Sequence, residues 1–355
     1  MHEINASALK AAAGLYHSYF TGLILTLVTR RGAAEAAQWV FQLFRHQHKE
    51  KFLSSFDKLG LTGLPDAVAC AAFHYLSNRI GGVNVEFMRE SDRKAWVNFV
   101  PPRWIYPGAS ICAVPSEVSR AFLGGWYAEN GVSLGNPRLG FVCTAQTTDG
   151  QHGLCGYFLE HDRSLAAGER LQFRPGELPP PFEPAAAPQL PAATWPPERL
   201  AKAERNYAME YVRSGLPRLV EIFGAAEAAH LGRVTGRLVG AQLYRETALL
   251  LGIEATGAEA FARFMLRLAA AEGDTAALAT QQDGATLVRR TGWRLMRGLE
   301  PLPAAVFEAW NGLLEGALAV HDRYLVLEVL ARLDWGDEAF VWRIRRPRGT
   351  GGSDH

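Results

Sequence analysis

The residues best suited to chemistry in this sequence gather around one predicted turn. Cys143 and Cys155 lie on either side of Asp149-Gly150, and His152 follows the turn. A thiolate is a nucleophile and a nearby imidazole can serve as its base, so these three are candidate catalytic residues. With Cys112 they would also offer a zinc ion three sulfurs and one nitrogen. Because CxxC and HExxH are absent and strand cysteines are often small buried residues, no cofactor is required, and zinc stays an alternative.

A second group of polar and aromatic residues lies between positions 101 and 155. Arg103 stands beside Trp104 and Tyr106, and a guanidinium among flat rings suits a carboxylate or a planar ligand. Alternatively, the rings cover the edge of the core and the arginine is solvated. Further candidate substrate contacts in this stretch are Trp126, Asn130, Asn136 and Arg138.

Other polar residues interrupt predicted helices. Arg245 and Glu246 stand in an apolar stretch, so they are candidates for a shared cleft or form an exposed turn of helix. His46 and His48 are two residues apart and diverge on a helix, so we expect a solvated face. His74 lies in an apolar helix, where we expect a core residue, with a pocket-lining role as the alternative.

The composition excludes a disordered chain and a dedicated nucleic-acid binder. Of 355 residues, 48% are hydrophobic, and 37 basic residues stand against 36 acidic ones. The four cysteines are too few for a disulfide framework, and the apolar stretch 20–28 is too short to span a bilayer. The one basic run comprises Arg343, Arg345, Arg346 and Arg348. We expect a cytoplasmic protein with a small-molecule ligand and neither nucleic acid nor membrane as partner, and a homodimer stays open.

The chain repeats itself. Gly32-Ala-Ala-Glu-Ala-Ala37 recurs at 224–229, a shift of 192 residues. The same shift relates Lys10 to Lys202, Tyr19 to Tyr211, Phe52 to Tyr244 and Gly60 to Gly252, and one residue less relates Phe73 to Phe264 and Asp92 to Asp283. Matched spacing over this length predicts a tandem duplication.

The duplication divides the chain into predicted parts. We expect a first α+β repeat at 1–172, a proline-rich linker at 173–197, a second repeat at 198–347 and a disordered tail at 348–355. Phe182 and Trp195 indicate that the linker is pinned to one half. In each repeat, three helices precede a hairpin, a further helix and a second hairpin. The predicted fold is α+β: two copies of a helical layer on a small antiparallel sheet, packed as an internal pseudo-dimer.

The last hairpin of the first repeat carries a family resemblance. It reads Asn136-Pro-Arg-Leu-Gly-Phe-Val-Cys143, then Asp149-Gly150, then Leu154-Cys-Gly-Tyr-Phe158. This element resembles the vinyl-4-reductase domain superfamily and, within it, the aminothiazoline-carboxylate hydrolase-like proteins. The resemblance implies a compact α+β domain that binds small hydrophobic or heterocyclic ligands and pairs two-fold. The second repeat lacks both cysteines, and the spacing between Cys143 and Cys155 is longer than in the family pattern.

Two functions follow as expectations. The first is an enzyme that cleaves C–N or C–S bonds of a small carboxylated or heterocyclic molecule by hydrolysis, with Arg103 holding the anion. The second is a sensor or carrier that binds such a molecule without turnover. The sequence contains neither a phosphate-binding glycine loop nor GxSxG, so nucleotide hydrolysis and serine esterase chemistry are not expected.

Overall fold

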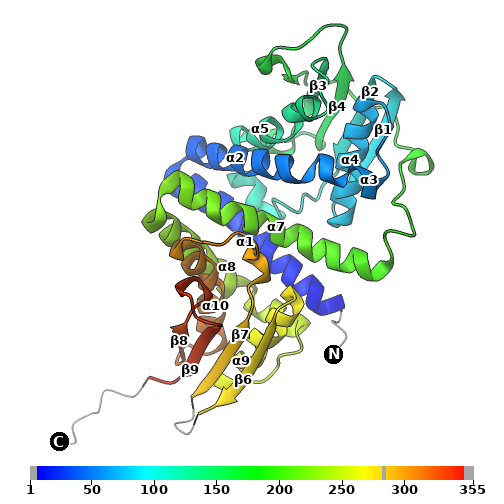
Figure 1. Ribbon diagram of the computed structural model, residues 1–355. Helices are drawn as coiled ribbons and strands as arrows, with labels where there is room; N and C mark the ends of the chain where they lie inside the picture. The colour runs from blue at the N-terminus through cyan, green and yellow to red at the C-terminus, as the bar shows by residue number, and fades with distance from the viewer. Residues whose placement is uncertain (1–5, 282–284, 348–355) are drawn as a thin grey trace, which may run out of the picture. The chain divides into compact units, whose positions relative to one another are not determined.

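The protein is a mixed helical and sheet structure. A computed structural model describes residues 6–281 and 285–347 (Figure 1). Helices make up 57% and strands 16%, in two small sheets, which confirms the predicted α+β class. The predicted turn at Asp283-Gly284, the match of Asp92 to Asp283 and the predicted tail at 348–355 fall outside the described residues.

The chain forms two compact units. The first unit comprises residues 24–207, and the second unit comprises residues 1–23 with 208–355. Both divisions fall inside long helices, α1 (Ala6–Arg31) and α7 (Pro197–Phe223). The start of each helix therefore belongs to one unit and its end to the other. The proline-rich segment lies within the first unit, so the units and the predicted sequence repeats have different limits.

In the first unit, helices pack on one face of a five-stranded sheet. The sheet has the order β1-β2-β4-β3-β5, in which β5 runs parallel to β3 and the other pairs are antiparallel. The core between α4 and the sheet is apolar. Successive side chains on a strand point to opposite faces, so every second residue of these strands points into this core. The helices are α2 (Ala33–Lys51), α3 (Phe56–Leu59), α4 (Asp66–Ile80), α5 (Ser116–Gly125) and α6 (Asn130–Ser133). The strands are β1 (Val85–Ser91), β2 (Lys94–Phe99), β3 (Leu139–Ala145), β4 (Leu154–Glu160) and β5 (Leu171–Phe173).

The proline-rich segment is held against this unit, as its aromatic residues predict. Phe182 packs on the core, and Ala187 is buried in it. The Trp195 indole Nε1 donates a hydrogen bond to the Lys58 carbonyl at 2.9 Å. Strand β5, just before this segment, was not expected from the sequence, because three residues carry too little periodicity to be recognised.

The second unit has a four-stranded antiparallel sheet in the order β6-β7-β9-β8. This order matches β1-β2-β4-β3 of the first unit. Its helices are α8 (Ala225–Leu250), α9 (Ala258–Glu272) and α10 (Ala304–His321). Its strands are β6 (Thr275–Thr280), β7 (Thr286–Thr291), β8 (Val326–Ala331) and β9 (Phe340–Arg345).

Among the described helices, α1 is the one long and apolar enough to cross a membrane. Of its most apolar stretch, 67% is buried inside the protein, as in the core helix of a soluble protein.

Two arginines of the C-terminal basic run form ion pairs within the second unit, because Arg343 and Arg345 both pair with Glu328.

Candidate functional site

The structure places the two hairpin thiols on different faces of the first sheet. Cys143 joins the core under the helices, and Cys155 joins the smaller cluster on the opposite face, with Trp96 and Tyr157. Burial raises the pKa of Cys143 to about 12 and the pKa of Cys155 to about 11. Both thiols are therefore protonated at neutral pH, which is unfavourable for a nucleophile.

The other two candidates for a metal site lie elsewhere. His152 and Cys112 are exposed, whereas the two hairpin thiols are buried. Within residues 6–281 and 285–347, no group of three or more His, Cys, Asp or Glu side chains could hold a metal ion.

Arg103 and its aromatic neighbours do lie together. The Arg103 Nη1 donates to the Thr147 hydroxyl at 3.3 Å, and its guanidinium lies 5.2 Å from the centre of the Phe99 ring. Burial raises the pKa of the Tyr106 and Tyr127 phenols, and the nearby positive charge of Arg103 partly offsets that rise. Trp104 is half-buried on the core, and its ring meets Tyr207 edge-on. These aromatic rings cover the core edge, while Arg103 stays partly exposed.

The remaining sequence candidates have local structural contacts or face solvent. Asn136 donates to Asp66 at 2.8 Å and accepts from the Arg138 backbone at 3.0 Å. The Arg138 side chain pairs with Glu160 at the surface. Arg245 and Glu246 are both exposed on α8.

A buried polar cluster in the first unit was largely missed by the sequence interpretation. We call it the His48 cluster: His48, Cys70, His74, Trp126 and Asn130. The expectation that His48 belongs to a solvated face is wrong, since only 1% of it is exposed. His48 follows Val40 and Phe44 at intervals of four residues, so it lies on the buried stripe of α2.

A break after α5 brings Trp126 and Asn130 into the cluster. The carbonyls of Gly124 and Gly125 accept hydrogen bonds from Arg45 at 2.8 and 3.0 Å. A Cβ at Gly125 would lie 2.7 Å from the Phe41 carbonyl oxygen, so only glycine permits this close approach to α2. The chain then turns, and Asn130 becomes completely buried.

Asn130 connects to both residues that α4 contributes. Its Nδ2 lies 3.1 Å from Nε2 of His74. Cys70 lies one turn before His74, and its pKa is raised by burial, which the Asn130 side chain partly offsets. The His74 ring stacks on Tyr127, with ring centres 3.9 Å apart and planes 10° from parallel. Burial holds the pKa of His74 well below its usual value, so the imidazole is neutral.

Four polar atoms of this cluster are buried without a hydrogen bond to any described residue. They are both ring nitrogens of His48, Oδ1 of Asn130 and Nε1 of Trp126. The His48 and Trp126 rings meet edge-to-face with centres 5.6 Å apart, and Asn130 is near enough to His48 to favour its charged form. Burial nonetheless lowers the pKa of His48 to about 4. Such atoms are normally satisfied by ordered water or a ligand.

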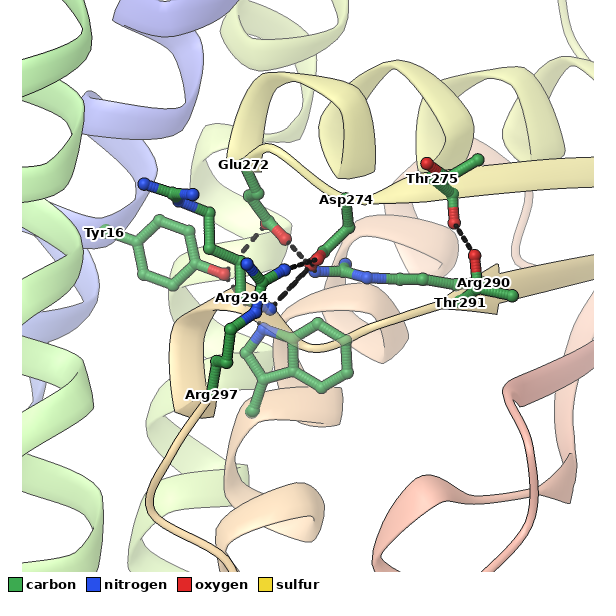
Figure 2. Close-up of polar contacts among 9 residues, drawn as sticks. Tyr16, Glu272, Asp274, Thr275, Arg290, Thr291, Arg294 and Arg297 are labelled. Atoms are coloured by element: carbon green, nitrogen blue, oxygen red, sulfur yellow. Dashed lines mark hydrogen bonds and ion pairs between the residues drawn. The ribbon is translucent and has the colours of Figure 1, made fainter.

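The second unit also has a buried polar cluster, but there the charges are paired (Figure 2). Arg290 donates to Glu272 and to Asp274, both at 2.5 Å, and Tyr16 donates to Glu272 at 2.8 Å. Asp274 also accepts the Arg294 backbone N–H at 3.0 Å. We call these residues, with Trp310, which donates to Tyr16 at 3.0 Å, the Arg290 network. Its carboxylates are occupied by protein groups, so its arrangement favours a structural role.

No family model, curated protein or solved structure matches this chain. The resemblance of the 136–158 hairpin to vinyl-4-reductase domains therefore stays a prediction.

Proposed function

We propose that this protein is a soluble, cytoplasmic small-molecule-binding protein whose site is the His48 cluster. The observation that carries the proposal is that four buried polar atoms of His48, Asn130 and Trp126 have no hydrogen-bond partner within the described part of the chain. Leaving such atoms unpaired costs about 1–3 kcal/mol each, a cost that a bound molecule would remove.

The chemistry of these atoms describes the ligand. A neutral imidazole offers one donor and one acceptor, the Trp126 indole offers a donor, and Asn130 Oδ1 offers an acceptor. The surrounding rings of Phe52, Phe73 and Trp126 suit a flat molecule. A small heterocycle meets both requirements. Tyr127 stacks on His74, and the positive charge of Arg103 is close enough to Tyr127 to lower its pKa. Arg103 is therefore the candidate partner for a carboxylate on that molecule.

We further propose that the two units arose by duplication and form the internal pseudo-dimer that the family resemblance implies. Supporting this, the bulge at Cys143/Ala145 in β3 recurs at Val329/Ala331 in β8, a shift of 186 residues. The short turn after each strand recurs at the same shift and ends on a left-handed glycine, Gly150 or Gly336.

Titration with pyridine-2-carboxylate, a flat carboxylated heterocycle, tests the binding proposal. We expect saturable binding by calorimetry and chemical-shift changes at the His48 ring nitrogens. His48→Leu should weaken binding about tenfold or more, the loss of one or two hydrogen bonds. His46→Leu, on the same helix but half-exposed, is the matched control and should bind normally.

The opposite result is equally clear. If a crystal structure shows only ordered water between His48, Asn130 and Trp126, and a panel of carboxylated and neutral heterocycles fails to bind, the proposal is wrong.

A hydrolytic enzyme is the second candidate function. The observation that favours it is that His48 is neutral at pH 7 and that, among the described residues, neither ring nitrogen is within hydrogen-bond geometry of a partner, so it is able to accept a proton from water. The thiols of Cys143 and Cys155 would then not act as nucleophiles. Product release from small cyclic amides, abolished by His48→Leu and retained by His46→Leu, would support this function. Binding without turnover would leave the carrier function.

A further inference from the structure

The Asn130 amide turns its nitrogen toward α4 and leaves its oxygen for another partner. Its Nδ2 lies 3.1 Å from Nε2 of His74, whose neutral ring accepts the hydrogen bond there. Burial lowers the pKa of His48, and the Asn130 side chain partly offsets this, as an acceptor near that ring does. Asn130 is completely buried, and its Oδ1 has no hydrogen-bond partner within residues 6–281 and 285–347. A carbonyl oxygen only accepts, so a molecule bound to it must supply a donor.

Trp126 supplies the opposite kind of group. The indole N–H only donates, and Nε1 is buried without an acceptor among the residues that the structure describes. The Trp126 ring meets His48 edge-to-face with centres 5.6 Å apart, and its centre lies 6.2 Å from that of the His74 ring. The indole and the Asn130 amide therefore border the same two imidazoles. A molecule that satisfies both must carry an acceptor as well as a donor.

The titratable groups of the cluster are neutral, so they offer a ligand no charge. Burial lowers the pKa of His48 to about 4, holds the pKa of His74 well below its usual value and raises the pKa of Cys70. Arg45 is close enough to lower the pKa of His48 further, but Glu129 pairs with it at 2.5 Å and two backbone carbonyls accept its other hydrogen bonds. A charged ring would be buried here without a counter-ion, which is costly. The cluster therefore favours a neutral ring.

We propose that the His48 cluster binds a neutral cyclic amide, a flat ring in which an N–H group stands next to a carbonyl. The N–H donates to Asn130 Oδ1, and the carbonyl accepts from Trp126 Nε1. His48 is compatible with either group, because a neutral imidazole offers one donor and one acceptor. This inference rests on the proposed function and narrows its ligand. A carboxylate on such a molecule would still pair with Arg103, which is not a member of the cluster.

Two ligands that differ by one methyl group test the inference by calorimetry. The ring of 2-pyridone carries an N–H next to its carbonyl, whereas in 1-methyl-2-pyridone a methyl group replaces that hydrogen. We expect 2-pyridone to bind about tenfold or more tightly than the methylated ring, which leaves Asn130 Oδ1 unpaired. Pyridine-2-carboxylate also lacks a ring N–H, so it should bind more weakly than 2-pyridone.

A variant links this preference to Asn130. In Asn130→Ala the two pyridones should bind within about twofold of each other, because the acceptor is gone. Asn84→Ala, which changes an exposed asparagine of the same unit, is the matched control and should keep the full preference. Circular dichroism shows whether both variants fold. If Asn130→Ala does not fold, the comparison of the two pyridones on the unaltered protein still decides.

The outcomes separate this inference from the proposed function. Equal binding of the two pyridones, or binding of pyridine-2-carboxylate without 2-pyridone, would overturn the inference and leave the proposed function intact. A preference for 2-pyridone that persists in a folded Asn130→Ala would also overturn it. If none of the three molecules binds, the proposed function fails together with the inference.

Discussion

The same helix positions hold side chains in one unit and almost nothing in the other. The shift of 192 residues relates Val40, Phe44 and His48 of α2 to Gly232, Gly236 and Gly240 of α8. In the second unit these glycines touch α10, and a Cβ at Gly240 would lie 2.1 Å from the Leu313 carbonyl oxygen. The second unit thus uses these positions for close helix packing, whereas the first unit uses them to hold a buried imidazole.

The partner helices differ in the same sense. The helix α10 runs unbroken for 18 residues, whereas α5 ends after 10 and the chain turns inward with Trp126 and Asn130. At the position equivalent to the His48 cluster, the second unit has a small apolar cavity of about 10 Å³, lined by Gly240, Tyr244 and Phe264 among others. That is room for about one water, with almost no polar surface to hold it. Within the described residues, a buried imidazole with polar neighbours therefore occupies this place in the first unit, and a small, mainly apolar cavity occupies it in the second.

Breaking the Arg290 network should have the largest effect. Arg290→Met leaves Glu272 and Asp274 buried without their cation, which should lower the free energy of unfolding by about 3–5 kcal/mol. Urea unfolding measures the change. Arg263→Met, which removes an exposed ion pair with Glu259 in the same unit, should cost less than about 0.5 kcal/mol. Equal losses from the two variants would show that the network contributes no more than a surface pair.

The second largest loss of stability is expected when one methyl group is added where the glycines of α8 pack against α10. Gly240→Ala should destabilise the protein by roughly 3 kcal/mol, because its Cβ cannot fit beside the Leu313 backbone. Thermal unfolding checks this. Gly14→Ala is the control: a Cβ there meets nothing within 4 Å, so it should be neutral or stabilising by up to about 1 kcal/mol. A tolerated Gly240→Ala would mean that α8 and α10 are not in close contact.

The pH dependence of stability tests the buried imidazole. His48 has a folded-state pKa of about 4, below its ordinary value of 6.5, so the unfolded chain takes up its proton first as the pH falls. The stability from neutral His48 is complete above pH 6.5 and is lost progressively toward pH 4, by ~3 kcal/mol in total.

A variant isolates this contribution. His48→Leu should flatten the decline of unfolding free energy between pH 6.5 and 4, measured by urea titration at each pH. His17 in the second unit has a pKa lowered to about 4 in the same way, so His17→Leu should flatten the same range. An unchanged profile in His48→Leu would place that ring in contact with water.

The smallest effect is expected from the buried Trp126 indole N–H. Trp126→Phe keeps a ring against His48 and Phe73 but removes the buried N–H, so stability should change by less than about 1 kcal/mol. Affinity for pyridine-2-carboxylate should fall about tenfold, because one hydrogen bond to the ligand is lost. Trp195→Phe should leave that affinity unchanged. A loss of several kcal/mol in stability would indicate that Nε1 is already satisfied by a structural water.

The elements of this fold were predictable because their signals are local. The order of helices and hairpins in each repeat was predicted, since period two and period 3.6 are read along the chain. The faces of Cys143 and Cys155 were not predictable, because a shift of one residue reverses every side chain on a strand and a bulge interrupts β3.

The candidate site was predictable only in part. Trp126 and Asn130 were named from the sequence, and the structure brings both beside His74. His48 was missed because the polar residues around it indicated an exposed face of the helix. Its spacing of four and eight residues from Phe44 and Val40 was the one signal that indicated a buried position. The break after α5 depends on a tertiary contact with α2, and a single sequence does not record such contacts.

The division of α1 between the units has a consequence for synthesis. Residues 6–23 leave the ribosome before residues 24–207 but belong to a unit completed only by residues 208–347. Their apolar side chains remain without the packing partners of their unit while residues 24–207 are translated and fold. During that interval a nascent chain presents an unsatisfied apolar helix, the kind of segment that chaperones bind. The order of translation thus makes the second unit complete its fold after the first.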